Sequence, residues 1–310
     1  MKVLVTGASG FVGAAIAEYL AAAGHEVIAA SRTPGPDRPG LWREVQLPDL
    51  RGVSLPPGFF EDAEAVVHAA GMAHQTRRTG EEDLHRVNGI AAGEIASAAR
   101  AAGVSRLVLI SSMRAVWGPV SSIPLAEETI PQPVDAYGRS KLFGEVLTSQ
   151  AFPHAVILRP PAVHGIGAKG KIGALGRLAL SMLPLPFGGL GGRHSVISDR
   201  NLAAAVDFVL HGTGDQVGPL HVADAGPLGL DEMVTVMRQA LGRRPGIVPM
   251  PPLVRGLLDR VGGGRVQQIS SGLKVSTDKI VALGWRPVEP SSAGLARMVR
   301  AAAGLAQTRL

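Results

Sequence analysis

Short apolar runs alternate with longer amphipathic segments through the first half of the chain. The runs are almost continuously apolar, which is typical of strands buried on both faces of a parallel sheet. Between them, apolar residues recur every three or four positions, and this spacing predicts helices. We expect strands at 1–5, 26–31, 41–46, 65–68, 106–111 and 155–159, and helices at 11–23, 82–102 and 135–150. Their alternation indicates an α/β fold with a doubly wound parallel sheet.

A glycine-rich turn, Thr6-Gly7-Ala8-Ser9-Gly10-Phe11-Val12-Gly13, joins the first predicted strand to the first predicted helix. Gly7 permits a tight turn, Gly10 lets the backbone approach a pyrophosphate, and Gly13 lets the helix pack against the strand. The positive end of the helix then faces the phosphates. A strand–turn–helix unit with this spacing predicts a Rossmann-type dinucleotide-binding fold. The expected loop contacts are Gly7, Ser9, Gly10, Phe11, Val12 and Gly13.

The second half of the chain is less regular. Glycine-rich segments at 165–176 and 188–192 come first, followed by a predicted helix at 198–210, a strand at 219–222, and helices at 230–241, 277–284 and 292–303. We expect a dinucleotide-binding domain at 1–165, to which 195–224 returns. Ligands of open α/β sheets lie beyond the carboxyl ends of the strands. A smaller C-terminal substrate-binding region would therefore comprise 166–194 and 225–310.

Composition excludes several classes of function. The 310 residues carry a net charge of +6, but the arginines are scattered, so nucleic acid binding is disfavoured and a phosphate-bearing small molecule fits better. The absence of cysteine excludes disulfides, thiolate metal sites and cysteine nucleophiles. The most apolar later stretch, 172–190, is interrupted by Arg177, prolines and glycines, so we expect no membrane span. The chain starts on a core strand rather than a leader, which predicts a cytoplasmic protein.

A second motif, Tyr137-Gly138-Arg139-Ser140-Lys141, places a tyrosine and a lysine on one face at the start of a predicted helix. A phenol with a pKa near 10 is a poor acid or base at neutral pH unless a cation stabilises its anion. The Lys141 ammonium is placed to do so. Tyr137 could then give a proton to a carbonyl oxygen or take one from an alcohol.

Together the two motifs resemble the short-chain dehydrogenase/reductase superfamily, and more closely its extended branch of nucleotide-sugar epimerases, dehydratases and ketoreductases. Residues 111–115 and 184–195 look most like bacterial proteins of polysaccharide biosynthesis that reduce or epimerise C4 of a UDP-N-acetylhexosamine-type sugar. Further matching segments are His68-Ala69-Ala70-Gly71, Ile110-Ser111-Ser112, 135–141, 158–165, Asp278-Lys279 and Leu283-Gly284-Trp285.

The resemblance implies that Tyr137 is the catalytic acid/base, that Lys141 lowers its pKa and binds the nicotinamide ribose, and that a serine or threonine binds the reacting oxygen. Counting forward from the fifth strand selects Ser112 for that last role, whereas counting back from Gly118 selects Met113, which cannot donate a hydrogen bond. We favour Ser112. Further implied dinucleotide contacts are Asp49, Leu50, Ala69, Ala70, Gly71, Ser111, Pro160 and Val163. Implied substrate contacts are Met72, Ser112, Met113, His164, Arg193 and His194.

Cofactor choice is determined at the end of the second strand, where an acidic residue would bind the 2′-hydroxyl of NAD. This chain has Ser31-Arg32 there. An arginine can bind a 2′-phosphate, and neither residue would repel it. We therefore favour NADP(H) over NAD(H), although Arg38 or a distant acid could change the outcome.

We predict an NADP(H)-dependent oxidoreductase that reduces the C4 ketone of a UDP- or dTDP-linked sugar. The alternatives are a 4-epimerase with retained NAD, a reductase of a small ketone or aldehyde, and a non-catalytic NADP(H)-binding sensor or scaffold. We expect a homodimer through helices 82–102 and 135–150, as is common in this family. No metal site is predicted, because His68, His74 and His85 lack a convincing ligand spacing.

Overall fold

Seven parallel strands form the central sheet of the computed structural model, which describes residues 1–34, 42–52, 54–72, 80–121, 123–212, 217–250 and 271–304. Their spatial order is β11-β6-β5-β4-β1-β2-β3. The predicted Rossmann-type α/β fold is confirmed. The strands are β1 (Lys2–Thr6), β2 (Glu26–Ser31), β3 (Trp42–Gln46), β4 (Ala65–His68), β5 (Arg106–Ile110), β6 (Val156–Arg159) and β11 (Gly218–His221).

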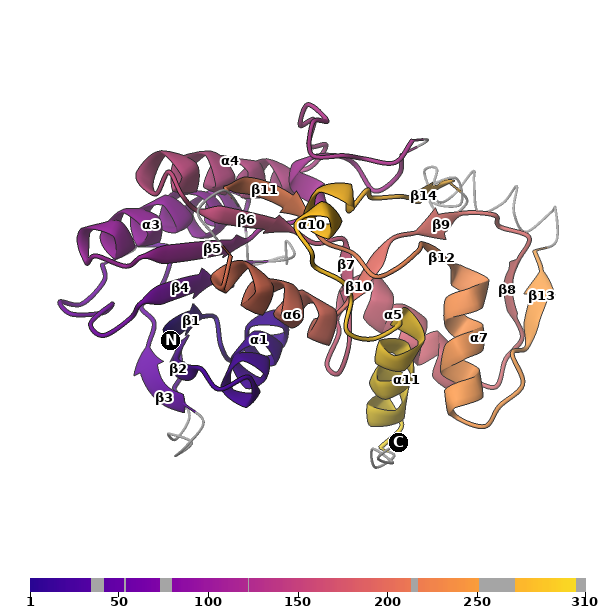
Figure 1. Cartoon of the computed structure of the whole chain (residues 1–310). Coiled ribbons are helices and arrows are strands. Elements are labelled where there is room, and N and C mark those ends of the chain that lie inside the picture. Colours follow the sequence, from indigo (N-terminus) through magenta and orange to yellow (C-terminus); the bar gives the residue numbers. More distant parts are fainter. Residues whose placement is uncertain are drawn as a thin grey trace.

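Helices cover both faces of this sheet (Figure 1). Helices α1 (Phe11–Ala22) and α6 (Asp199–Leu210) pack on one face. The other face carries α2 (Glu81–Leu84), the π-helix η1 (His85–Ile90), α3 (Ala91–Ala101) and α4 (Ala136–Ala151), so the helix predicted at 82–102 consists of three consecutive segments. Successive strand residues point to opposite faces. In β1, Val3 and Val5 pack toward α1 and α6, and Leu4 packs toward α3.

A smaller region lies beside the sheet (Figure 1). Its helices α5 (Gly170–Leu180), α7 (Leu230–Ala240) and α11 (Ser291–Ala302) enclose a separate core that includes Leu175, Met237 and Leu295. Short strands surround it: β7 (Ala162–His164), β8 (Leu185–Gly188), β9 (Arg193–His194), β10 (Val196–Ser198), β12 (Leu228–Gly229), β13 (Ile247–Pro249) and β14 (Gly272–Leu273). Helix α10 (Asp278–Ala282) and the 3₁₀ turn η2 (Met113–Ala115) complete the elements discussed below.

The prediction of an irregular segment at 165–176 was wrong in part, because α5 begins within it at Gly170. Its glycines hid the helical pattern, yet at Gly173 a β-carbon would lie 2.4 Å from the Ala168 carbonyl oxygen. Gly173 is therefore needed where the segment that leads into α5 lies against the helix. Within the described residues, no helix has both the length and the apolar character required to cross a membrane.

The chain leaves the central sheet after β6, passes through β7 to β10, and comes back along α6 to form β11. Strand β11 pairs in parallel with β6, with Leu220 opposite Leu158, and so forms one edge of the sheet. The carboxyl ends of all seven strands share one side. The loops that follow β1, β2, β4 and β5 on that side carry the candidate site.

Candidate active site

The glycine-rich loop after β1 is wound tightly. Gly7 has a φ of 71°, and a β-carbon on it would lie 2.7 Å from the Cα of Ala70. A β-carbon on Gly13 would lie 2.1 Å from the Gly7 carbonyl oxygen, so side chains are excluded at both positions. Gly10 is the N-cap of α1 and donates its N–H to the same carbonyl at 2.8 Å. Phe11 and Val12 begin the helix and Ser9 is exposed, so this terminus fits the phosphates of a dinucleotide.

The described residues of the loop after β2, 31–34, include a cation and no carboxylate. Ser31 is 1% exposed and its hydroxyl donates to the Thr33 carbonyl at 3.1 Å, whereas Arg32 is exposed. Across the strand ends, hydrogen bonds from Arg51, with a smaller contribution from the charge of Arg32, hold the pKa of Asp49 at about 2. Arg38 lies outside the described residues. The exposed cation expected for a 2′-phosphate is therefore the side chain of Arg32.

Leu50, a predicted dinucleotide contact, is 6% exposed and belongs to the core beneath α3. Its side chain therefore packs inside the protein, and only its backbone faces the strand ends.

After β4, an asparagine that sequence reasoning missed organises the loop. Asn88, in η1, accepts a hydrogen bond from the Met72 N–H at 2.8 Å and donates to the Met72 carbonyl at 2.9 Å. Its amide also donates to the Ser140 hydroxyl at 3.0 Å, which links this loop to α4. A β-carbon on Gly71 would lie 2.8 Å from the Asn88 Oδ1 and 3.2 Å from the Lys141 Nζ. The signal in the sequence was a buried amide within an alanine-rich helical pattern, next to Gly89.

His68, at the end of β4, is buried and pairs with Thr6. Its Nδ1 lies 2.7 Å from the Thr6 hydroxyl, which also accepts the Ala70 N–H at 3.2 Å. Burial, together with the charge of Lys141, lowers the pKa of His68 to about 3, so its ring is neutral at physiological pH. The dipeptide Ala69-Ala70 is thereby held against the glycine-rich loop.

Lys141 is 8% exposed and donates from Nζ to the Ile110 carbonyl at 3.0 Å. Burial lowers its pKa to about 8, an effect partly offset by the negative charge of Glu145 one turn along α4. Glu145 accepts a hydrogen bond from Ser111 and forms a bidentate ion pair with Arg159. Ser111, predicted to contact the dinucleotide, thus has its hydroxyl committed to this buried pair.

Tyr137 lies in the first turn of α4, where its phenol interacts with Ser112. Asp135 caps this helix by accepting the Gly138 N–H at 2.8 Å, and it forms an ion pair with Arg114. A β-carbon on Gly138 would lie 2.3 Å from the Arg114 carbonyl oxygen, so the glycine allows η2 to approach α4.

Burial raises the pKa of the Tyr137 phenol, and Asp135 raises it further, while the Ser112 hydrogen bond and the charge of Arg114 lower it. The charge of Arg114 thus adds to the effect that the sequence assigns to Lys141, whose role toward Tyr137 stays a prediction.

The two alternatives after β5 point in different directions. Ser112 faces Tyr137, and its Oγ also accepts the Arg114 N–H at 3.2 Å. Met113 is 1% exposed and packs in a small apolar cluster with Val116 and Leu125. The structure therefore brings Ser112 to the phenol and packs the side chain of Met113 in the protein interior.

Three other predicted substrate contacts, His164, Arg193 and His194, lie on the short strands β7 and β9. His164 has no exposed surface, and its Nε2 lies 2.8 Å from a carboxylate oxygen of Asp224, so its ring is an interior residue rather than a substrate contact. Of the predicted dinucleotide contacts, Pro160 is buried and Val163 packs against the core. Arg193 is exposed on β9 and pairs with Glu232 at 2.9 Å, and its neighbour His194 is half-buried.

Comparison with known proteins identifies the family. A model described as NAD dependent epimerase/dehydratase family matches residues 3–211. The chain belongs to this family. It is 27% identical over 314 residues to UDP-glucose 4-epimerase of Vibrio cholerae, covering 97% of this chain and 95% of that protein.

Two further matches are a curated reductase and a solved structure. dTDP-4-dehydrorhamnose reductase of Mycolicibacterium smegmatis is 27% identical over 79% of this chain and 70% of its own length. The solved structure of MoeE5 in complex with UDP-glucuronic acid and NAD has a TM-score of 0.77 at 23% identity, covering 98% of this chain and 99% of that chain. The protein is thus an extended short-chain dehydrogenase/reductase, in a family of nucleotide-sugar epimerases and reductases.

Three histidines, His68, His74 and His85, were candidates for metal ligands, and the structure describes His68 and His85. His68 bonds to Thr6, and His85 stacks on Phe143 with ring centroids 4.4 Å apart. His74 lies outside the described residues. The arrangement at the strand ends suits proton exchange with a carbonyl or alcohol oxygen, because the phenol of Tyr137 and the hydroxyl of Ser112 lie together beside a loop that fits a dinucleotide.

Proposed function

We propose that this family member is an NADP(H)-dependent oxidoreductase that reduces the C4 ketone of a nucleotide-linked sugar, a UDP- or dTDP-sugar. The observation that carries the proposal is that Tyr137 and Ser112 lie together beyond the carboxyl ends of the strands, where Ser112 lowers the pKa of the phenol, beside a loop that fits a dinucleotide. A nicotinamide dinucleotide would supply the hydride. The residues that would hold it are the glycine-rich loop, Arg32, residues 69–71 and Lys141.

In this proposal Tyr137 donates its phenolic proton to the substrate oxygen as the ketone becomes an alcohol. Ser112 hydrogen-bonds to the same oxygen and orients it. Arg114 favours the phenolate that remains, and Asp135 opposes it, so this ion pair adjusts the acidity of Tyr137. Lys141, with its pKa at about 8, is mostly an ammonium at neutral pH and can donate to a ribose hydroxyl.

The preference for NADP(H) rests on Arg32. Its guanidinium is exposed at the end of β2, and residues 31–34 contain no carboxylate. A 2′-phosphate would find a charge-assisted partner there, whereas an acidic residue would be needed to bind the free 2′-hydroxyl of NAD. Arg32→Ala should raise the KM for NADPH by about tenfold or more, and leave that for NADH nearly unchanged, because one charged hydrogen bond contributes roughly 1.5–3 kcal/mol.

A second candidate is epimerisation at C4 with a retained dinucleotide. It is favoured by the match to UDP-glucose 4-epimerase along 97% of this chain. The same residues would serve, because Tyr137 would first take and then return the proton. The two functions differ in their products, since an epimerase consumes no net NADPH.

The test is a steady-state assay of the purified protein. NADPH or NADH is mixed with 4-keto nucleotide sugars, and with UDP-glucose for the epimerase arm, and both nicotinamide absorbance and sugar products are followed. Tyr137→Phe should lower kcat by about 10²–10⁴-fold while dinucleotide binding persists. Tyr19→Phe is the matched control, because Tyr19 is the only other tyrosine in the chain.

Three outcomes would contradict the proposal. Equal activity in Tyr137→Phe would remove the assigned acid. Interconversion of UDP-glucose and its C4 epimer without net NADPH oxidation would favour the second candidate. Binding of NADPH without turnover across the keto-sugar panel would indicate a non-catalytic sensor or scaffold.

We also propose a cytoplasmic location, in keeping with the lack of cysteine.

We further propose a homodimer formed through helices 82–102 and 135–150. Helices α3 and α4 pack together, and Val146 on α4 leaves its apolar side chain 45% exposed. Sedimentation should give the mass of two chains. Val146→Glu should shift it to one, whereas a single-chain mass for the unmodified protein would contradict the dimer.

A further inference from the structure

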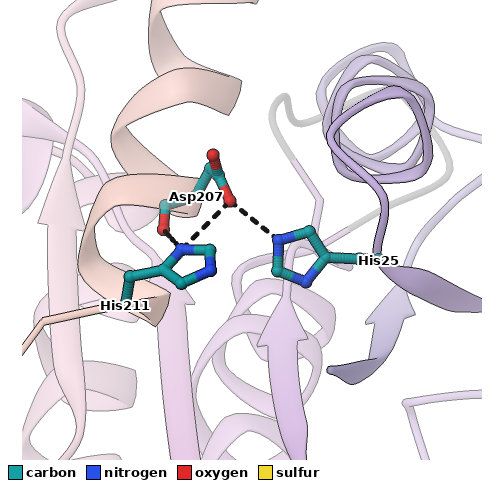
Figure 2. A group of neighbouring side chains, drawn as sticks. All are labelled: His25, Asp207 and His211. Atoms are coloured by element: carbon teal, nitrogen blue, oxygen red, sulfur yellow. Dashed lines mark hydrogen bonds and ion pairs between the residues drawn. The ribbon is translucent and has the colours of Figure 1, made fainter.

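Two histidines and an aspartate from distant parts of the sequence converge where α1 joins β2 and α6 ends (Figure 2). His25 Nε2 lies 2.9 Å from Asp207 Oδ1, and His211 Nδ1 lies 3.4 Å from the same oxygen. The two imidazole rings meet edge to face with centroids 5.1 Å apart. His25 is separated from Asp207 by 182 residues, so folding alone assembles the cluster.

The local backbone holds each side chain in place. Gly24, with a φ of 90°, ends α1, and the His25 N–H then donates to the Leu20 carbonyl at 3.0 Å. Asp207 and His211 stand one helical turn apart at the end of α6. Helices α1 and α6 pack on the same face of the sheet, so the three side chains sit on a rigid base.

The cluster lies at the opposite end of the sheet from the candidate active site. His25 directly precedes β2, whereas Ser112 and Tyr137 lie beyond the carboxyl ends of the strands. It therefore does not take part in the proposed hydride and proton transfer.

The donor set suits a divalent transition metal. Imidazole nitrogen and carboxylate oxygen are ligands for Zn²⁺ and its neighbours, at about 2.0–2.2 Å from the metal. In a tetrahedral site with such bonds, ligand atoms are about 3.3–3.5 Å apart. The three ligand atoms here all lie within 4.8 Å of one another, so they need only small shifts to share one ion.

Access to the cluster is open on one side. The side chain of His25 is 3% exposed, that of Asp207 23% and that of His211 60%. A shallow groove lined by Tyr19, Phe208 and residues 283–286 borders Asp207 and His211. The charge of Asp207 adds to burial in raising the pKa of Tyr19, so its negative field reaches into this groove. A fourth ligand, such as water, could approach from there.

We propose that His25, Asp207 and His211 form a site for one divalent transition-metal ion of the Zn²⁺ class. The ion joins the α1–β2 turn to the end of α6 and stabilises the folded protein. Nδ1 of His25 has no partner among the described residues. Nδ1 of His211 lies 2.9 Å from the Asp207 carbonyl oxygen, so metal binding would replace that one bond, and the largely exposed His211 ring is free to turn for it (Figure 2).

The experiment uses full-length protein without an affinity tag, freed of metal by chelation. Zn²⁺ is titrated by calorimetry, and Co²⁺ by its visible absorption, which reports the coordination number. We expect one ion per chain. At a free Zn²⁺ concentration a hundredfold above Kd, the melting temperature should rise by about 4 °C.

His211→Ala and Asp207→Asn should each weaken binding by at least about tenfold, because each removes one of three ligands. His154→Ala, which removes an exposed histidine before β6, should bind as the unmodified protein does. NADPH binding by every variant reports that it is folded. A spectrum of hexaaqua Co²⁺ with no calorimetric signal would overturn the proposal, as would unchanged affinity in His211→Ala or equal loss in His154→Ala.

Discussion

Removing the charge of Glu145 should destabilise the protein far more than the same change at the surface. The side chains of Glu145 and Arg159 are 4% and 5% exposed, and their closest oxygen and nitrogen lie 2.6 Å apart. Glu145→Gln leaves the Arg159 guanidinium buried and facing a neutral amide, in which one of the two acceptor oxygens is replaced by an NH₂ group that can only donate. Breaking a buried pair from one side costs roughly 3–5 kcal/mol. We expect the free energy of unfolding to fall by about that amount.

The matched control is Glu82→Gln. Glu82 pairs with Arg86 at 3.1 Å, but their side chains are 78% and 49% exposed, so solvent screens the pair. An exposed pair of this spacing contributes about 0.3–0.5 kcal/mol. Urea unfolding followed by circular dichroism gives both values.

A Glu145→Gln loss below about 1 kcal/mol, or one equal to that of Glu82→Gln, would refute the reasoning. The double variant Glu145→Met/Arg159→Met should recover most of the loss, because two well-packed apolar residues leave no buried charge. A double variant no more stable than Glu145→Gln would also contradict it, since the uncompensated charge would then not be the cause.

Three further predictions concern the site. Gly13→Ala should weaken dinucleotide binding and lower the free energy of unfolding by about 1–3 kcal/mol, because its β-carbon would lie 2.1 Å from the Gly7 oxygen. Gly52→Ala is the control, because a β-carbon there would have no heavy atom within 4 Å. Equal effects of the two changes would contradict the close approach of Gly13 to Gly7. Ser112→Ala should raise the pKa of Tyr137, so the half-maximal pH of alcohol oxidation should move upward, and an unchanged pH profile would count against their hydrogen bond. Burial holds the pKa of His68 at about 3, below the unfolded value of 6.5. The contribution of the neutral His68 ring to the free energy of unfolding is therefore complete above about pH 7. It is lost as the pH falls, by about 2 kcal/mol between pH 7 and pH 5. In urea unfolding at both pH values, the free energy of unfolding of His68→Gln should therefore fall by about 2 kcal/mol less than that of the unmodified protein.

The pattern of apolar residues along the sequence was sufficient to predict the strands of the central sheet. Its seven strands and α1, α4 and α6 were predicted within a few residues, because each buries a periodic apolar face. The short strands of the smaller region were missed. Strands such as β9 and β12 have two residues each and exist only through pairing with distant segments, which no local pattern encodes.

The candidate site was partly predictable. The glycine-rich loop and Tyr137 carry local signatures, and the structure places Ser112 rather than Met113 beside the phenol. The roles of Asn88 and Arg114 were not predictable, because they depend on how η1 and η2 pack against α4. His164 could not be assigned to the interior from sequence, since its partner Asp224 is 60 residues away.

The position of β11 has a consequence for the nascent chain. Strand β6 is synthesised well before residues 218–221, so its outer edge stays unpaired while the intervening segment is made. An unpaired edge of a hydrophobic strand can pair with another chain. Translation must therefore proceed through residue 221 before β11 can pair with the free edge of β6. A ribosome that stalls earlier would release a polypeptide prone to aggregation, although every residue of the glycine-rich loop, Tyr137 and Lys141 would already be present in it.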